Sequence, residues 1–179
     1  MMKFSSFLKI AAVPAMLLAA APAFAQDQKL NVSFSANSRN GVCYFSVEGP
    51  NAPGTEQPMT LEFSYRVRDG NMGATIKVNG WDRVQKADAE KTYPMTIVLD
   101  SGKTKPSRSG GYESGFNDTI WSGFGPGELS APLLELLRTA RTARIDVDGM
   151  KLGPFDLQMK GLAYVSLTQC TERVKAGKE

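Results

Sequence analysis

The amino-acid sequence predicts a mainly β protein, a β-sandwich or flattened barrel with one or two short helices. Three observations support this fold class. Many short runs alternate apolar and polar residues, turn-forming glycines and aspartates separate these runs, and only two stretches have helical spacing. No internal repeat or long linker interrupts residues 26–179, so we expect them to form a single domain.

Residues 1–25 have the pattern of a secretory signal peptide. Two lysines make the start basic, the run Ile10–Ala21 is nearly all apolar, and Ala23–Ala25 fits the small-residue cleavage rule. The run is too short to span a bilayer, and no second stretch reaches transmembrane length. We therefore expect cleavage before Gln26 and a bacterial periplasmic or secreted protein with no membrane span.

The charge balance argues against nucleic acid as a partner. The chain has 21 basic and 18 acidic residues, a formal net charge of +3, but Lys3 and Lys9 belong to the predicted signal peptide. Their removal lowers the net charge by two, from +3 to +1. A nearly neutral chain has no long-range attraction for nucleic acid or for an anionic membrane.

The two cysteines, Cys43 and Cys170, are predicted to form a disulfide bond. An exported protein folds in an oxidising compartment, which favours their pairing. They lie near the two ends of the predicted domain, so the bond would tie the first strands to the last segment. A redox-active pair is the alternative interpretation, although the C-x-x-C spacing of such sites is absent.

Several runs have the period of two that is typical of strands. The clearest extends from Met59 to Val67, and the turn residues Asp69–Asn71 follow it, which predicts a hairpin with one buried face. The nearly continuous apolar run Met95–Leu99 predicts a central strand. The strand candidates are residues 30–34, 42–47, 59–67, 72–78, 95–99, 145–147 and 155–159.

Two segments have the spacing of helices. Ser130 is expected to cap the first helix, and Pro132 lies in its first turn. The apolar face of this helix would consist of Leu133, Leu136, Leu137 and Ala140. The second helix is predicted over Leu162–Val174, directly after Gly161.

The segment from Ser101 to Gly127 is rich in serine, glycine, basic residues and aromatic residues. Aromatic faces among glycines can stack on sugars or on a partner protein, and nearby cations can hold anionic groups. We predict a binding surface here for an unknown protein or glycan, formed by Lys103, Lys105, Arg108, Tyr112, Phe116, Trp121 and Phe124. In the alternative interpretation, Trp121 and Phe124 pack into the core and the basic stretch is a solvated loop.

The chain contains no histidine, which excludes Ser-His and Cys-His nucleophile systems and most zinc sites. An enzyme would need a carboxylate pair or a Ser-Lys arrangement. The acidic candidates are Asp100, Glu113, Asp118, Glu128, Asp146, Asp148 and Asp156. Nothing in their spacing places two of them across a cleft, so solvated turns and strand ends are the better interpretation, and no cofactor is predicted.

The run Asp146–Gly149 is similar to the start of a calcium loop. The ligands that should follow are replaced by Met150, Lys151 and Leu152. An Asp-Gly pair between two alternating runs is instead typical of a hairpin turn, so no metal site is predicted.

Motifs near the C-terminus follow one another in the order helix, strand, strand, and glycine before a final helix. They are Leu133–Leu137, Ala143–Val147, Phe155–Leu157 and Gly161–Leu162, with Leu167 and Cys170. This pattern resembles the end of invasion-associated locus B type proteins, which are small exported proteins of alphaproteobacteria. The resemblance implies a β-rich periplasmic or secreted fold without established catalysis, and a link to envelope integrity or host contact.

These observations predict a non-catalytic binding or envelope-associated protein. The alternative is a carboxylate-dependent hydrolase that acts on envelope or sugar substrates. A subunit of a larger envelope complex is a third interpretation, which the sequence does not separate from the first.

Overall fold

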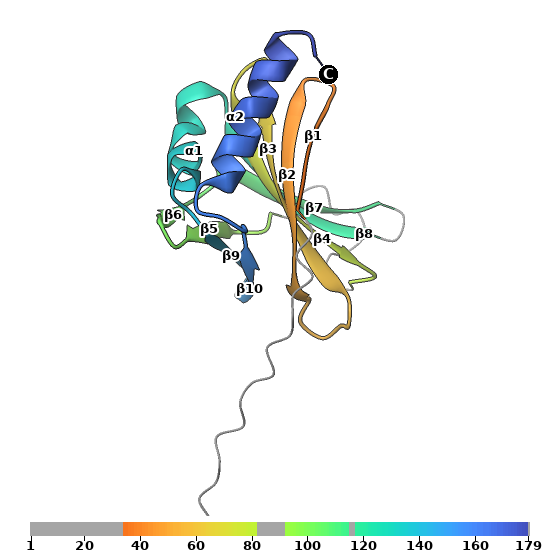
Figure 1. Cartoon of the computed structure of the whole chain (residues 1–179). Helices are drawn as coiled ribbons and strands as arrows, with labels where there is room; N and C mark the ends of the chain where they lie inside the picture. The colour runs from red at the N-terminus through yellow and green to blue at the C-terminus, as the bar shows by residue number, and fades with distance from the viewer. Residues whose placement is uncertain (1–33, 82–91, 115–116, 179) are drawn as a thin grey trace, which may run out of the picture.

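Two antiparallel β-sheets share one hydrophobic core in the computed structural model, which describes residues 34–81, 92–114 and 117–178 (Figure 1). The fold is mainly β, with two sheets, two α-helices and no closed barrel among the described residues, which confirms the predicted fold class. The predicted signal peptide, residues 1–25, lies outside this part of the chain.

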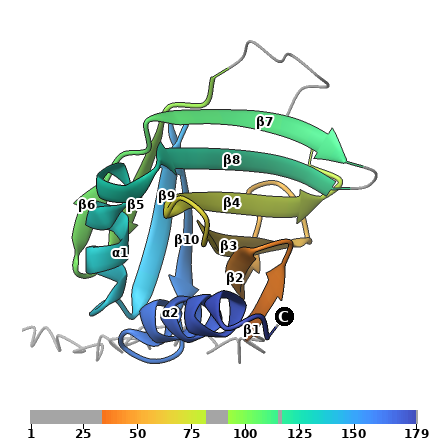
Figure 2. The ribbon, with the colours of Figure 1, turned by 90° about the horizontal axis from the view of Figure 1, so that it is seen from above.

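The larger sheet has six strands, and its two edges are β1 and β7. The chain runs back and forth from β1 to β4 and returns to the same sheet with β7 and β8, as the view from above shows (Figure 2). In spatial order the strands are β1 (Phe34–Arg39), β2 (Val42–Asn51), β3 (Pro58–Arg66), β4 (Asn71–Asn79), β8 (Asn117–Gly125) and β7 (Arg108–Ser114).

The smaller sheet has four strands. In spatial order they are β10 (Met150–Asp156), β9 (Thr142–Val147), β5 (Met95–Leu99) and β6 (Gly102–Thr104). β5 lies between β9 and β6, as its apolar run predicts. β9 and β10 form a hairpin whose two turn residues, Asp148 and Gly149, have φ angles of 48° and 76°. This left-handed backbone matches the hairpin predicted from the Asp-Gly pair.

Alternating burial builds the core between the sheets. Phe45 of β2, Phe63 of β3 and Ile76 of β4 are buried, whereas the residues that flank them in each strand are only partly buried. The sheets meet where β10 packs on β2. A Cβ atom at Gly49 would lie 2.3 Å from the ring of Phe155, so the missing side chain allows this close contact.

Two predicted strands end earlier than their sequence pattern suggests. β3 ends at Arg66 because the next residues turn, with a hydrogen bond from the Gly70 amide to the Arg66 carbonyl. Val67 therefore lies in the turn. β10 ends at Asp156, and Met159 is 63 % exposed in the turn before the last helix.

Helices lie at one end of the core. The 3₁₀ turn η1 (Gly127–Leu129) leads into α1 (Ala131–Leu137), which buries Leu133 and Leu137, while Leu136 is only partly buried. α2 (Leu162–Lys175) begins after Gly161, as predicted, and packs against β1, β2 and β3. It therefore extends the cover over the inner face of the six-stranded sheet.

Ser130 does not cap α1 with its side chain, in contrast to the prediction. It occupies the N-cap position, but its hydroxyl accepts a hydrogen bond from the Met72 amide at 2.7 Å and donates one to the Gly125 carbonyl at 2.5 Å. The hydroxyl thus joins the start of α1 to β4 and β8. The fold brings these two backbone groups within hydrogen-bonding distance of the Ser130 hydroxyl. The hydroxyl therefore binds them instead of the amides in the first turn of α1.

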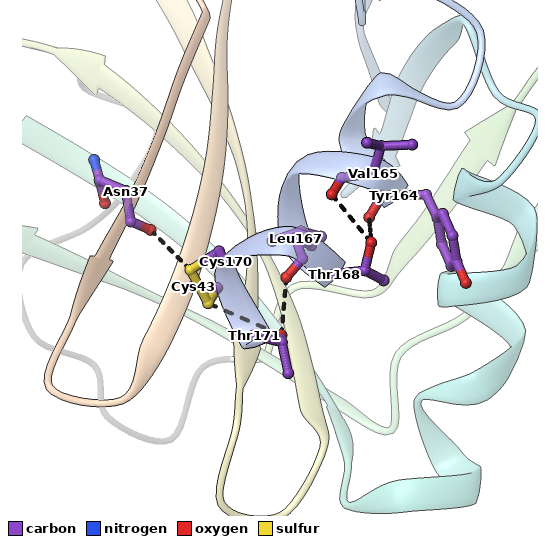
Figure 3. The surroundings of a disulfide bond; sticks show 8 residues. All are labelled: Asn37, Cys43, Tyr164, Val165, Leu167, Thr168, Cys170 and Thr171. Atoms are coloured by element: carbon purple, nitrogen blue, oxygen red, sulfur yellow. Dashed lines mark hydrogen bonds between the residues drawn. A yellow bond between two sulfur atoms is a disulfide. The ribbon is translucent and has the colours of Figure 1, made fainter. Parts of the chain in front are cut away.

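The predicted disulfide bond joins Cys43 of β2 to Cys170 of α2 (Figure 3). Both cysteines are fully buried, and the Thr171 hydroxyl lies 3.9 Å from the sulfur of Cys43. Since Cys43 faces the core, the bond holds α2 on the inner side of the sheet. No described helix is both long enough and apolar enough to cross a membrane.

We predict that loss of the disulfide lowers the free energy of unfolding by about 4–5 kcal/mol, because the bond closes a loop of 127 residues. Urea unfolding of Cys43→Ala, Cys170→Ala and the double variant measures this. All three should lose the same stability, since either single substitution already breaks the bond. A double variant whose loss equals the sum of the two single losses would contradict this account.

Candidate functional site

The outer face of the six-stranded sheet, the side turned away from the core, is the candidate site. Cross-strand pairing arranges its residues in rows that cross β2, β3, β4, β8 and β7. One row is Tyr44, Ser64, Gly73, Gly123 and Arg108, and the next is Ser46, Glu62, Thr75, Trp121 and Gly110. These positions alternate with core residues of the same strands, so the outer face is mostly polar, with aromatic rings among small residues.

The predicted aromatic segment is divided between the two faces of the sheet. Tyr112 of β7 and Trp121 of β8 share the outer face with Arg108, and Tyr112 is 44 % exposed. Phe124, by contrast, is 3 % exposed and belongs to the core, so it cannot contribute to a surface. The core-packing interpretation therefore holds for Phe124, which packs inward. Trp121 lies on the outer face, as the binding-surface interpretation requires.

Neither of the two predicted lysines lies on this face. Lys103 is exposed on β6, in the other sheet, and Lys105 is exposed in the loop that leads to β7. Lys105 and Arg108 line one depression of about 420 Å³ next to the start of β5. Phe116 lies outside the described residues.

The indole ring of Trp121 lies flat on the neighbouring strand. Its direct cross-strand partner is Gly110, where a Cβ atom would lie 2.9 Å from each of three adjacent ring atoms, Nε1, Cε2 and Cζ2. Equal distances to adjacent atoms mean that the face of the ring, not its edge, covers the glycine. Any side chain at Gly110 would push the indole away from the sheet.

A depression of about 260 Å³ lies beside the Trp121 ring. Two glycines, Gly73 and Gly123, form part of its floor. A Cβ atom at Gly123 would lie 3.6 Å from Nε of Arg108 and 4.0 Å from Cζ3 of Trp121. The other lining residues are Val42, Ser64, Arg66, Asn71, Met72 and Ser122. The depression thus has a cation and an aromatic ring side by side.

A second depression of about 400 Å³ shows that the outer face is concave. Its lining includes Asn37 of β1 and Tyr112 of β7, which are the two edge strands of the sheet. A flat sheet would hold these residues too far apart to border one hollow, since neighbouring strands are about 4.8 Å apart. The remaining lining residues are Arg39, Tyr44, Glu62, Thr75 and Lys77.

The concave face has an excess of positive charge. Glu62 accepts hydrogen bonds from the Lys77 ammonium group at 2.9 Å and from the Ser46 hydroxyl at 3.1 Å. Arg39 and Arg108 form no ion pair with any residue that the structure describes. Within the described ranges, the outer face thus has two arginines without an acidic partner, together with Glu48 of β2, which also forms no ion pair there.

At the end of the face, Arg66 is compensated by the turn that follows β3. Its Nε donates a 2.9 Å hydrogen bond to Asp69, and this bond is the main cause that lowers the pKa of the Asp69 carboxyl. The Asn71 amide also donates to the same carboxylate, at 3.2 Å. Asp69 thus holds Arg66 beside the 260 Å³ depression.

Sequence reasoning missed the part of this face that β1–β4 contribute. Tyr44, Glu62 and Lys77 occupy the polar positions of runs whose apolar positions predict strands. The signal was present, because every second residue of a half-buried strand must face outward. What the sequence does not reveal is that β4 pairs with β8, which brings these residues next to Trp121.

A smaller depression of about 180 Å³ lies between α1, α2 and β3. Tyr65, Leu167 and Thr171 border this depression, and so do two charged residues, Glu172 and Lys175. None of the predicted binding residues lines it, and it holds one aromatic side chain, against two in the larger hollow of the outer face.

The acidic residues considered for catalysis lie in turns, in ion pairs or on separate elements. Asp100 accepts hydrogen bonds from the Arg141 and Thr142 amides, and Asp146 pairs with Arg144 on the same strand at 2.7 Å. The others, on β7, β8, η1, the β9–β10 turn and β10, are Glu113, Asp118, Glu128, Asp148 and Asp156. Of these, Glu113 and Asp118 are direct cross-strand partners on β7 and β8. Within the described ranges, no three acidic or cysteine residues form a group that could hold a metal ion.

The position of Trp121 depends on Gly110, and two alanine substitutions test this. Gly110→Ala should displace the indole, increase quenching of its fluorescence by acrylamide and lower stability by about 1 kcal/mol or more. Gly123→Ala is the matched control, because the nearest atom to its Cβ would be the flexible Arg108 side chain at 3.6 Å. Equal quenching in the two variants would contradict the proposed contact.

Asp100 provides a test of pH dependence. Burial opposes its charge, but hydrogen bonds from the Arg141 and Thr142 amides outweigh this effect and lower its pKa below 3.8. Because the pKa is lower in the folded state, the stabilisation is present above the unfolded-state pKa and is lost as the pH falls through the folded-state pKa.

Asp100→Asn should therefore reduce the free energy of unfolding at pH 7 by no more than about 1 kcal/mol, since the carboxylate is exposed to solvent. Urea unfolding from pH 7 down to pH 2 should show the difference from wild type shrinking as the pH falls. A difference that stays constant over this range would refute the role of the charge.

Comparisons with known proteins identify no relative. No protein-family model, curated protein or solved structure matches the chain. The resemblance to invasion-associated locus B type proteins thus stays a prediction from the C-terminal motifs.

Proposed function

We propose that this protein is an exported, non-catalytic binding protein that holds a glycan on the concave outer face of its six-stranded sheet. One observation carries the proposal: the Trp121 indole lies flat over Gly110 and borders an open depression. An indole held parallel to a surface presents a broad apolar platform. The C–H face of a sugar ring is the ligand surface that best matches such a platform.

Two further rings extend the platform to the second depression. Tyr44 and Tyr112 border it from β2 and β7, so aromatic groups lie along both parts of the face. Hydrogen-bonding groups line the same depression, including the Asn37 and Thr75 side chains. Sugars need this combination, because their ring faces are apolar and their edges carry hydroxyl groups.

The shape of the face favours a glycan over a protein partner. A protein interface of ordinary size has an apolar core that excludes water. The outer face instead is concave, polar and divided into two hollows, and three of its strand positions are glycines. An extended chain of sugar rings fits such a trough.

The carboxylates on this face support binding rather than hydrolysis. Glycosidases use two carboxyl groups about 5–10 Å apart on either side of the scissile bond. Glu62 is the one carboxylate among the described residues that line the two depressions, and Lys77 and Ser46 already engage it. The hydrolase alternative would rest on Glu113 and Asp118, which are cross-strand partners at the same strand phase as the buried Ile120 and therefore do not belong to the outer face.

The proposal also includes export from the cytoplasm. A buried disulfide is typical of proteins that fold in an oxidising compartment such as the periplasm or the cell exterior. The predicted signal peptide indicates the same location. An envelope-associated role, implied by the resemblance to the invasion-associated locus B type proteins, belongs to this proposal, because envelope surfaces are rich in glycans.

Affinity electrophoresis through a panel of neutral and acidic polysaccharides tests the proposal. At least one glycan should retard the wild-type protein, and Tyr112→Ala and Trp121→Phe should each weaken binding about tenfold through lost ring contact. Val165→Ala is the matched control, because Val165 of α2 is 44 % exposed, as Tyr112 is, and lies away from the face.

Thermal melts of all variants show that the fold is intact. A wild-type protein that no polysaccharide retards would contradict the proposal. Tyr112→Ala and Trp121→Phe variants that bind as tightly as Val165→Ala would also contradict it.

A further inference from the structure

We propose that the glycan is acidic: a carboxylate on a sugar ring pairs with Arg108 while the ring itself stacks on Trp121. This inference rests on the proposed function, since it assumes that the outer face binds a glycan. It names the chemical class of that glycan as a chain of uronic acids.

Arg108 lies next to the Trp121 ring on the outer face. Arg108 is the cross-strand partner of Gly123, which lies two positions after Trp121 on β8. A Cβ atom built on Gly123 would lie 3.6 Å from Nε of Arg108 and 4.0 Å from Cζ3 of the Trp121 indole. The guanidinium group and the indole are therefore close neighbours. A sugar ring stacked on the indole would therefore have its edge next to the guanidinium group.

Arg108 has no acidic partner among the residues that the structure describes. Arg66 is paired with Asp69, and Lys77 is paired with Glu62. Arg108 and Arg39 have no acidic partner among the described residues, and both are exposed. A neutral ligand would leave these two charges uncompensated, whereas an acidic chain would meet one in each depression.

Positive charge continues beyond the outer face. Arg108 also lines the depression of about 420 Å³ that Lys105 borders. A ligand that extends past Trp121 in this direction would meet a second cation. This gives the predicted basic stretch a role that the aromatic rings alone do not explain.

The choice of a carboxylate follows from the chemistry of arginine. A guanidinium group is planar and presents its N–H donors as a fork that matches the two oxygens of a carboxylate. Uronic acids carry such a group directly on the ring. Stacking and pairing can then act on the same sugar residue.

Calorimetric titration with three probes tests the inference. The probes are a hexamer of galacturonic acid, its methyl ester, which has the same rings without charge, and polyglutamate, which has the charge without rings. The acid should bind the wild-type protein about tenfold more tightly than the ester, because a charge-assisted hydrogen bond is lost in the ester. Polyglutamate should bind at least as weakly as the ester.

Two variants locate the charge that matters. Arg108→Gln should bind the acid about tenfold more weakly and the ester as wild type does. Arg141→Gln is the matched control: it removes the same charge at an exposed position before β9, outside the face, and should bind like wild type.

The outcomes separate this inference from the proposed function. Equal binding of acid and ester overturns the inference but leaves glycan binding in place. Polyglutamate that binds as tightly as the acid, or equal losses in Arg108→Gln and Arg141→Gln, also overturns the inference, because charge alone would then explain the binding. If no probe binds, the uronate assignment is wrong, and the polysaccharide panel decides the proposed function independently.

Discussion

Burial of one face of the six-stranded sheet is the constraint on which the rest of the structure depends. β10 and α2 cover the inner face, so the buried residues of β2, β3 and β4 must all point to the same side. A slip of one residue in any strand would turn its apolar set outward. The core therefore sets the register, and the register in turn determines which side chains meet on the outer face.

The candidate site is a consequence of that register. Trp121 lies opposite Gly110, and Arg108 lies opposite Gly123, because these pairs belong to strands whose inner residues are held in the core. The disulfide has a related role, since it keeps α2 on the inner side, where Cys43 points. One face is thus closed by packing and a covalent bond, and the other carries the candidate site.

Strand periodicity predicted much of this fold. In a run such as residues 59–67, every second residue is apolar because one face of the strand is buried in the core. Gly161 likewise marked the start of α2. The division of the aromatic segment could not be predicted, since it depends on the strand phase: Phe124 points inward and Trp121 outward. Ser130 is a residue type that often caps helices, but its hydroxyl forms hydrogen bonds with the Met72 amide and the Gly125 carbonyl of neighbouring strands instead.

The candidate site could be predicted only in part for the same reason. The residues of β7 and β8 lie in one stretch of sequence and have a recognisable composition. Their neighbours on β1–β4 are ordinary polar residues until the pairing of β4 with β8 brings them together. Long-range strand pairing is not encoded in local patterns, so the structure is needed to show the concavity and the two arginines that have no acidic partner among the described residues.

The most direct test of the central claim uses Trp121 as its own reporter. The chain has two tryptophans, and Trp81 is 2 % exposed in the core, so a Trp81→Phe variant leaves Trp121 as the single indole. Titration with the galacturonic acid hexamer should change the emission of Trp121 to saturation, with the same Kd that calorimetry gives. Calorimetric binding without any change in that emission would show that the ligand binds elsewhere and would contradict the account.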